Sequence, residues 1–338
     1  MKKIMEYKTW IGLAILFALI YWLPLPIYIL HVIILTLLYA FMGTAWNLLC
    51  GYGGQLSLGY AAFTGMGAYT TLLLYRSFDL SPWLGMLLGG ILSTLLMAVI
   101  AYPCFRFGIR GPYFTLASIA VAEILRDVLT TLRELTGGSL GLSLPYHPTN
   151  FWIFQFDGKK EYYLIILLFW LIAIFIVKNL KRLKYYLIAI REDEDAAAAL
   201  GISVNKTLLC AALISAFLTS IGGAFYVQYF RYIDPDSIAG IGLSVSIALI
   251  SVVGGTSTLF GPSIGALILV PISEYLRLSF GAKFAGLHLL IYGVLLIVTI
   301  RFLPDGIISL FSRKRLRRKN DETKKQSETK VERGNANE

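Results

Sequence analysis

Apolar runs long enough to cross a lipid bilayer recur along almost the whole chain, and they limit its possible folds more than any other feature. A transmembrane helix needs about 20 mostly apolar residues. Hydrophobic residues make up 57% of the 338 positions and charged residues 15%, against about 25% charged residues in ordinary soluble domains. Only helices and closed barrels satisfy the backbone in lipid, and unbroken apolar runs lack the alternation of a barrel. The sequence therefore predicts an all-α integral membrane protein.

About ten transmembrane helices are expected, and the first of them is uncleaved. Residues 1–22 have the basic end and the apolar run of a signal peptide, but they lack a small-x-small cleavage site. Because the first helix is short and only a Gly-rich turn separates the eighth from the ninth, nine or eleven spans remain open. The expected helices lie at about 7–23, 27–50, 56–75, 82–105, 112–132, 161–178, 207–229, 239–256, 259–279 and 283–303.

Basic residues in the expected loops set the orientation of the chain. With both termini in the cytoplasm, 22 of the 30 Lys and Arg residues lie on the cytoplasmic side and seven outside, and Arg126 lies within the fifth helix. The opposite orientation would invert that bias. We therefore expect both termini in the cytoplasm, with residues from about 179 to 206 as the largest cytoplasmic loop.

The chain divides into a transmembrane domain at 1–312 and a basic cytoplasmic tail at 313–338. The tail carries ten basic and five acidic residues without apolar periodicity, so we expect it to be disordered. It starts with RKRLRR just beyond the last helix, where each basic residue near an anionic leaflet contributes about 1 kcal/mol. The sequence favours membrane lipid as the partner of this run, which then anchors the topology, over the alternative of nucleic acid.

The stretch REDEDAAAALGI, residues 191–202, predicts a short helix in the largest cytoplasmic loop. Ala196 to Ala199 are strong helix formers, and Gly201 supplies the terminating conformation. A helix of about nine residues is roughly 13 Å long and too short to be stable alone in water. Its small side chains would let another protein approach the backbone, while an ordinary surface helix is the alternative. Its first turn, at the positive end of the helix dipole, is acidic: Glu192, Asp193, Glu194 and Asp195.

This stretch resembles the coupling-helix or EAA loop of ABC importer permeases, which has Glu-Ala-Ala and, after three further residues, Gly. Asp195, Ala196, Ala197 and Gly201 take those positions, with Asp in place of Glu. Other segments resemble, in the same order, the LivM-type branched-chain amino acid permeases, and they cover nearly the whole chain outside the tail. They are GYGGQLSLGYAAFTGMGAY (51–69), RGPYFTLASIA (110–120), TGGSLGL (136–142), SVVGGTSTLFGPSIGA (251–266) and FLPDGI (302–307).

The resemblance implies a type II ABC importer permease in a bacterial or archaeal cytoplasmic (inner) membrane. The implied partners are a second, LivH-type permease, two ABC ATPases and an extracytoplasmic substrate-binding protein. This chain would bind no cofactor, because ATP and Mg²⁺ are used by the ATPases, and it has no G-x-x-x-x-G-K-[ST] motif. The implied cargo is leucine, isoleucine and valine, and urea or short-chain amides are the alternative.

Polar side chains near a Gly-rich helix break are candidates for the translocation pathway. The glycines of segment 51–69 permit sharp bends and close helix approach, and broken membrane helices often line transport sites. Tight packing, with the polar groups satisfied locally, is the alternative. The candidate pathway residues are Asn47, Gln55, Ser57, Tyr113, Thr115 and Ser118.

Intramembrane charge is sparse, which argues against a proton-driven transporter. Glu123, Arg126 and Asp127 lie toward the outer end of the fifth expected helix, and Glu274 and Arg277 toward that of the ninth. A charge at mid-membrane costs about 2.5 to 3.5 kcal/mol, so we expect these residues to pair with each other or to lie at the interface. A proton relay would need such groups throughout the membrane depth.

One motif suggests catalysis but lacks the necessary context. Gly137 to Gly141 spell G-x-S-x-G around Ser139, and His147 lies close by, so a rhomboid-like intramembrane serine hydrolase is a remote alternative. The motif has meaning only on a strand-to-helix elbow with an acid and a base in reach, and here it lies in an external loop. The three cysteines show no metal spacing. We expect no catalytic residue and no metal site, and a channel is a further alternative.

Overall fold

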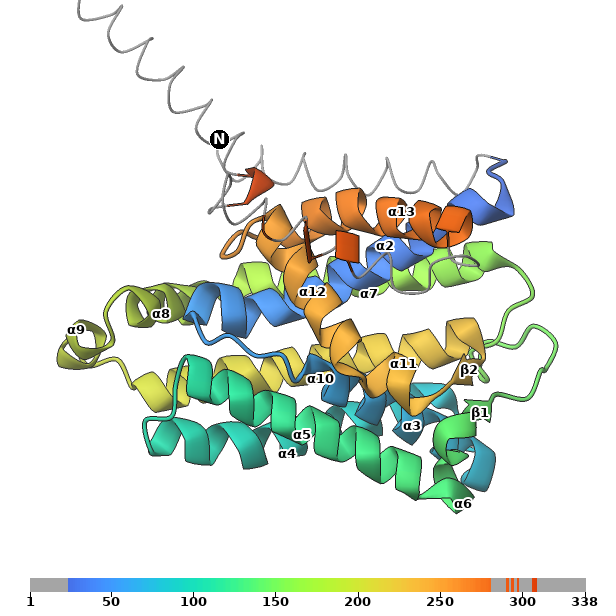
Figure 1. Cartoon of the computed structure of the whole chain (residues 1–338), viewed down its shortest axis with the longest axis horizontal. Helices are drawn as coiled ribbons and strands as arrows, with labels where there is room; N and C mark the ends of the chain where they lie inside the picture. Colours follow the sequence, from blue (N-terminus) through green and yellow to red (C-terminus); the bar gives the residue numbers. More distant parts are fainter. Residues whose placement is uncertain (1–23, 281–289, 292, 295–296, 298–305, 309–338) are drawn as a thin grey trace, which may run out of the picture.

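The computed structural model is a bundle of long helices and describes residues 24–280, 290–291, 293–294, 297 and 306–308 (Figure 1). The expected first helix at 7–23, most of the expected last helix at 283–303 and the tail at 313–338 lie outside the described residues.

The long helices of the described part follow the apolar runs of the sequence. They are α2 (Ile27–Trp46), α3 (Tyr60–Phe78), α4 (Pro82–Arg106), α5 (Pro112–Thr131), α7 (Lys159–Asn179), α10 (Val204–Phe230), α12 (Ile241–Gly254) and α13 (Gly261–Phe280). The expected helical membrane protein is confirmed, while the expected number of about ten helices is not. Among the described residues, five segments are long and apolar enough to cross a membrane: Ile27–Tyr52, Pro82–Arg106, Lys159–Asn179, Val204–Phe230 and Pro235–Gly254.

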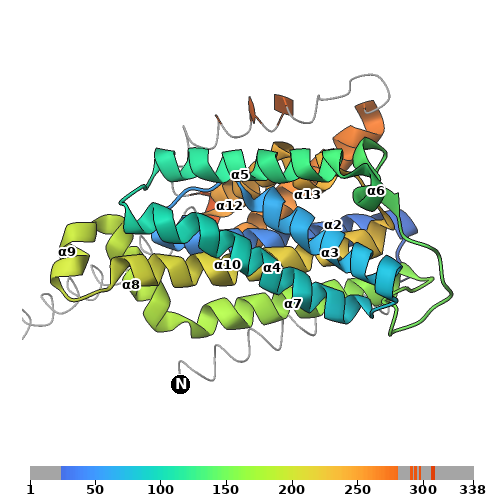
Figure 2. The same ribbon diagram turned by 90° about the horizontal axis from the view of Figure 1, so that it is seen from below.

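Short elements connect the long helices and mark the two ends of the bundle. Strands β1 (Leu142–Ser143) and β2 (Tyr232–Ile233) pair antiparallel, with Leu142 opposite Ile233. They lie with α6 at one end, whereas α8 and α9 lie at the other (Figures 1 and 2). The remaining short elements are the π-helix η1 (Asn47–Tyr52), α6 (Arg133–Thr136), the 3-10 helix η2 (Gly138–Leu140), α8 (Lys181–Glu192), α9 (Glu194–Ala199) and α11 (Pro235–Ala239).

The helix expected at 56–75 begins only at Tyr60, because residues 54–59 form no regular structure. Their backbone bonds to side chains of α5 instead. Leu58 N donates to Ser118 Oγ at 3.2 Å, and Thr115 Oγ1 donates to Leu56 O at 2.8 Å. These bonds satisfy backbone groups that a membrane-embedded loop would otherwise leave unpaired. We call residues 51–59, from the end of η1 to the start of α3, the first break.

Helix α10 lies in the middle of the bundle and packs against α2, α3 and α4 (Figure 2). The contact with α3 depends on two glycines. A Cβ atom at Gly223 would lie 1.9 Å from Thr64 O, and one at Gly67 would lie 2.1 Å from Ser220 O. Small residues allow membrane helices to approach this closely. Helix α2 completes the core by packing against α7, α12 and α13.

Candidate functional site

The candidate coupling segment, residues 191–202, lies at the end of the bundle, where α8 and α9 project beyond the long helices (Figures 1 and 2). Asp193 stands between α8 and α9 in an extended conformation. Asp193 Oδ1 accepts a hydrogen bond from Ala196 N at 2.9 Å, which caps the start of α9. The expected short helix is present, but it has six residues rather than about nine.

The acidic run is divided between the two helices. The prediction that four carboxylates share one first turn is wrong for Glu192, which ends α8 and whose Oε1 lies 2.6 Å from Arg191 Nη2. Asp193 must leave the helical conformation in order to cap α9, and this interrupts the helix. Glu194 and Asp195 do lie in the first turn of α9. Gly201, which follows α9, has a φ of 84°, a conformation that favours glycine.

Helix α9 presents mainly small side chains to its surroundings. Ala197 is buried at 2% exposure, while the other three alanines and Leu200 are exposed. At Gly201, nothing lies within 4 Å of the position that a Cβ atom would take. With six residues, α9 is about 9 Å long. It is a short projection from the bundle, and it depends on its neighbours for stability.

Arg110, between α4 and α5, holds α9 to the bundle, and the sequence did not single it out. Its guanidinium forms an ion pair with Glu194, and its Nη2 donates to Asn205 Oδ1 at 2.7 Å. Burial lowers the pKa of Arg110, although the Asp195 carboxylate opposes that shift; arginine stays charged in proteins. A cavity of about 400 Å³ lies beside this ion pair. Arg110 begins the family-like segment 110–120, but nothing near it in sequence indicates Glu194.

Arg110→Ala is expected to loosen α9 without unfolding the bundle. Losing a hydrogen-bonded contact of about 1 kcal/mol should speed amide hydrogen exchange in α9 about fivefold, measured by mass spectrometry on the purified protein. Arg106→Ala is the matched control, because Arg106 Nη1 donates to Tyr102 of its own helix. Equal exchange of α9 in both variants would contradict the assigned role of Arg110.

Four of the six candidate pathway residues meet where the first break crosses the start of α5. Thr115 and Ser118 make the contacts to the break described above, and Gln55 Oε1 accepts a hydrogen bond from Gly111 N at 3.1 Å. Ser57, within the break, is only 1% exposed. The structure therefore gathers Gln55, Ser57, Thr115 and Ser118 at one junction.

The other two candidates lie apart from this junction. Asn47 is buried in η1, where its Nδ2 donates to Thr258 O at 2.8 Å and its Oδ1 accepts from Ser257 N at 3.0 Å. Tyr113 is 73% exposed on α5. The internal hydrogen bonds of the buried candidates fit the packing alternative, and contact of any of the six with a solute stays a prediction.

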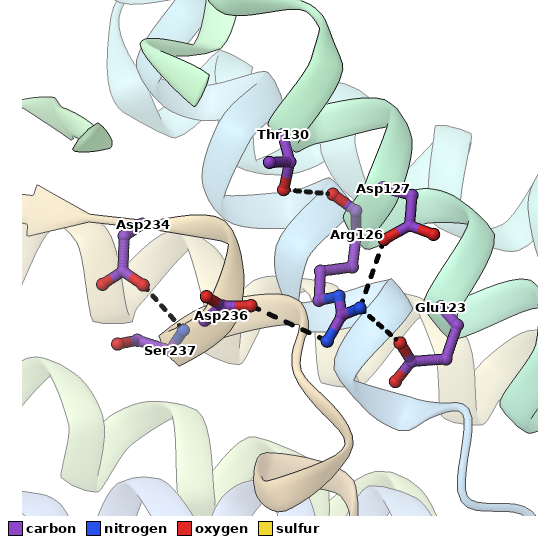
Figure 3. Close-up of polar contacts among 7 residues, drawn as sticks. All are labelled: Glu123, Arg126, Asp127, Thr130, Asp234, Asp236 and Ser237. Atoms are coloured by element: carbon purple, nitrogen blue, oxygen red, sulfur yellow. Dashed lines mark hydrogen bonds and ion pairs between the residues drawn. The ribbon is translucent and has the colours of Figure 1, made fainter. Parts of the chain in front are cut away.

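Charged side chains near the far end of α5 form one network, shown in Figure 3. Arg126 Nη2 lies 2.9 Å from Glu123 Oε2 and 3.2 Å from Asp127 Oδ1, and its Nη1 lies 3.7 Å from Asp236 Oδ1 of α11. The expectation that these charges pair is confirmed. The link to α11 was not predicted, because Asp236 lies in the loop between the helices expected at 207–229 and 239–256, far from α5 in the sequence.

The second expected charge pair also forms. Glu274 Oε2 and Arg277 Nη2, one turn apart on α13, lie 2.7 Å from each other. Glu274 is buried, so the arginine compensates a carboxylate that would be costly in an apolar environment.

Comparison with known proteins identifies the family of this chain. Residues 28–300 match the family described as branched-chain amino acid transport system / permease component. The chain belongs to this family. The permease is 28% identical to the high-affinity branched-chain amino acid transport system permease protein LivM of Escherichia coli. That alignment spans 314 residues and covers 86% of this chain and 72% of the LivM protein. The permease is also 25% identical to the probable branched-chain amino acid transport permease protein LivH of Methanocaldococcus jannaschii, over 253 residues that cover 72% of this chain and 79% of the LivH protein. No solved structure matches it.

The permease places its G-x-S-x-G residues in a turn rather than at a nucleophile elbow. Ser139 is exposed in η2, which follows α6 and precedes β1, so the strand-to-helix geometry that the motif requires does not occur here. Gly141 has a φ of 70°, and a Cβ atom there would lie 2.3 Å from Ile233 O. The motif therefore serves the β1–β2 pairing. Among the described residues, no three His, Cys, Asp or Glu side chains are grouped to hold a metal ion.

Proposed function

We propose that the permease is one of two membrane subunits of an ABC importer for leucine, isoleucine and valine. The observation that carries this proposal is α9, a capped six-residue helix with small exposed side chains that projects from the bundle. Because α9 projects outside the apolar core, it does not bind a solute within the membrane. Its shape suits a partner's groove. Family membership and the names of the relatives support the cargo.

In the proposed mechanism, two partner ATPases hold α9 and use the ATP and Mg²⁺. Their closure on ATP moves α9 and switches the paired permeases between outward-facing and inward-facing states. The permease performs no chemistry, and it shifts the equilibrium by making different contacts in the two states. A short chain of contacts supports this route, because Arg110 binds α9 while the adjacent Gly111 N donates to Gln55 in the first break.

The proposed second permease, of the LivH type, is supported by the outer face of α5. Helix α5 buries Phe114, Ser118, Ala122 and Leu129 among its 20 residues, while the side chain of Asp127 is 69% exposed. Ionisable side chains within membrane segments almost always face protein or a water-filled cavity rather than lipid. A second permease over this face would keep the Arg126 network away from lipid, and the solute would cross between the two subunits.

The proposed orientation places the α9 end and both termini in the cytoplasm. The bias of 22 cytoplasmic Lys and Arg residues out of 30 supports it, since basic residues accumulate in cytoplasmic loops. The β1–β2 end then faces outward, where an extracytoplasmic substrate-binding protein delivers the solute.

Uptake of labelled leucine, with labelled urea as the comparator, tests the cargo. Cells without the gene are expected to lose high-affinity leucine uptake and to keep urea uptake, and the plasmid-borne gene should restore the loss. Loss of urea uptake alone would replace the proposed cargo with urea and leave the coupling proposal in place. Unchanged uptake of leucine in cells that have no other leucine transporter would contradict the cargo.

A further inference from the structure

Arg191, the residue before the acidic run, reaches back into the bundle rather than toward α9. Its Nη1 donates to Gly51 O at 3.3 Å and also to Ser257 Oγ. Ser257 Oγ in turn donates to Gly51 O at 2.6 Å. Gly51 belongs to the first break, and Ser257 to the connection between α12 and α13, residues 255–260, which we call the second break. One side chain of the projecting segment therefore contacts both breaks.

The first break is built to receive this side chain. Gly51 lies near the end of η1, where backbone carbonyls lack partners within the helix and a cation is favourable. Gly54 has a φ of 69°, and a Cβ atom there would lie 2.5 Å from Arg191 Cγ. Glycine at this position therefore leaves room for the arginine stem. Leu187 of α8, which is fully buried, packs beside it against Gly53.

The second break is also held to η1, by the side chain of Asn47. Asn47 of η1 bonds to the backbone of Ser257 and Thr258 through both ends of its amide, as described above. Ser257 itself has a φ of 61°, which is uncommon for a residue other than glycine. Short π-helices such as η1 are frequent at functional sites. Arg191, Ser257 and Asn47 thus join α8, the second break and η1 into one polar network.

We propose that Arg191 is the positioning residue that transmits movement of α9 to the two membrane breaks. This inference rests on the proposed function, in which ATPases move α9. Arginine suits the role, because its planar fork holds Glu192 with Nη2 while Nη1 reaches Gly51 and Ser257. Lysine keeps the charge but has a single flexible ammonium group, so it cannot span the same set of partners.

The assembled complex in proteoliposomes tests this inference by the amount of leucine moved per ATP hydrolysed. Arg191→Ala is expected to lower uptake at least tenfold while ATP hydrolysis stays within about twofold, and Arg191→Lys should be intermediate. Arg182→Ala is the matched control on α8, because Arg182 Nε donates to Tyr186 of the same helix. An unchanged ratio in Arg191→Ala, or a loss of uptake that parallels loss of the complex from the membrane, would overturn the inference.

Hydrogen exchange with and without a non-hydrolysable ATP analogue separates this inference from the proposed function. In the wild-type complex, the analogue is expected to change exchange in α9 and in both breaks. In Arg191→Ala the change should persist in α9 and disappear from the breaks. A change that persists in the breaks of the variant overturns the role of Arg191, whereas no change anywhere in the wild-type complex overturns the coupling proposal itself. Unlike the leucine-to-ATP ratio, hydrogen exchange does not depend on which solute is carried.

Discussion

Gly201→Arg and Asp195→Arg are each expected to lower leucine uptake at least tenfold while the permease remains in the membrane. Gly201 follows α9 with open space around it, and Asp195 is exposed in its first turn. In the proposed function an ATPase groove encloses α9, so a long cationic side chain at either position would enlarge the part to be enclosed, and arginine at position 195 also reverses a charge. Uptake by whole cells, normalised to the permease in isolated membranes, measures the effect.

Gly108→Arg is the matched control for Gly201→Arg. Gly108 lies in the connection between α4 and α5, which reaches α9 through Arg110, and it has a φ of 71° with nothing within 4 Å of its Cβ position. Both substitutions therefore impose a similar backbone cost of about 1 to 2 kcal/mol and add the same side chain. If Gly108→Arg reduces uptake as much as Gly201→Arg, the loss does not report on α9 and the coupling role fails.

Gly223→Val is expected to destabilise the bundle more than any other single change considered above. Its Cβ atom would lie 1.9 Å from Thr64 O, and a backbone oxygen cannot move aside as a flexible side chain can. Helices α3 and α10 would have to separate, and such overpacking costs about 1 to 3 kcal/mol. At about 2 to 4 °C per kcal/mol, a cost near the upper limit lowers the Tm by roughly 6 to 12 °C. Thermal unfolding of the detergent-purified permease measures this shift, with the folded fraction at each temperature monitored by size-exclusion chromatography.

The control for this prediction is Gly242→Val in α12, where nothing lies within 4 Å of the Cβ position. It adds the same side chain to a helix without a clash, and valine has a higher helix propensity than glycine. The Tm of Gly242→Val should stay within about 2 °C of wild type. A similar drop in both variants would show that the α3–α10 crossing is not the origin of the effect.

Within the described part of the chain, sequence reasoning placed the long helices well, because an apolar run of the right length has few alternatives in a membrane. It failed where a local polar contact decided a boundary. The helix expected at 239–256 starts at Ile241 because Asp234 caps a separate helix, α11, by accepting a hydrogen bond from Ser237 N at 2.9 Å. Asp193 divides the acidic run of the candidate site in the same way.

The contacts that connect the candidate site to the rest of the bundle join residues far apart in the chain. No local sequence pattern encodes such contacts. Arg191 approaches Gly51 and Ser257, and Arg110 approaches Glu194, only because the bundle brings four connections to the same end. The short helix and its capping glycine were predictable from residue types. The arginines beside it were visible in the quoted segments, but their partners required the fold.

The pairing of the two-residue strands β1 and β2 holds one end of α10 in place, while its other end follows the coupling segment. This helix of 27 residues is about 40 Å long; it starts just after the coupling segment, at Val204, and ends just before β2. Pairing with β1, together with Leu144 N donating to Arg231 O at 2.8 Å, pins that far end. A displacement of about 3 Å at the start of a 40 Å rod is a tilt of about 4° and fades to nothing at the pinned end. A movement of the coupling segment would therefore displace α10 most at Val204 and least at the end that pairs with β1.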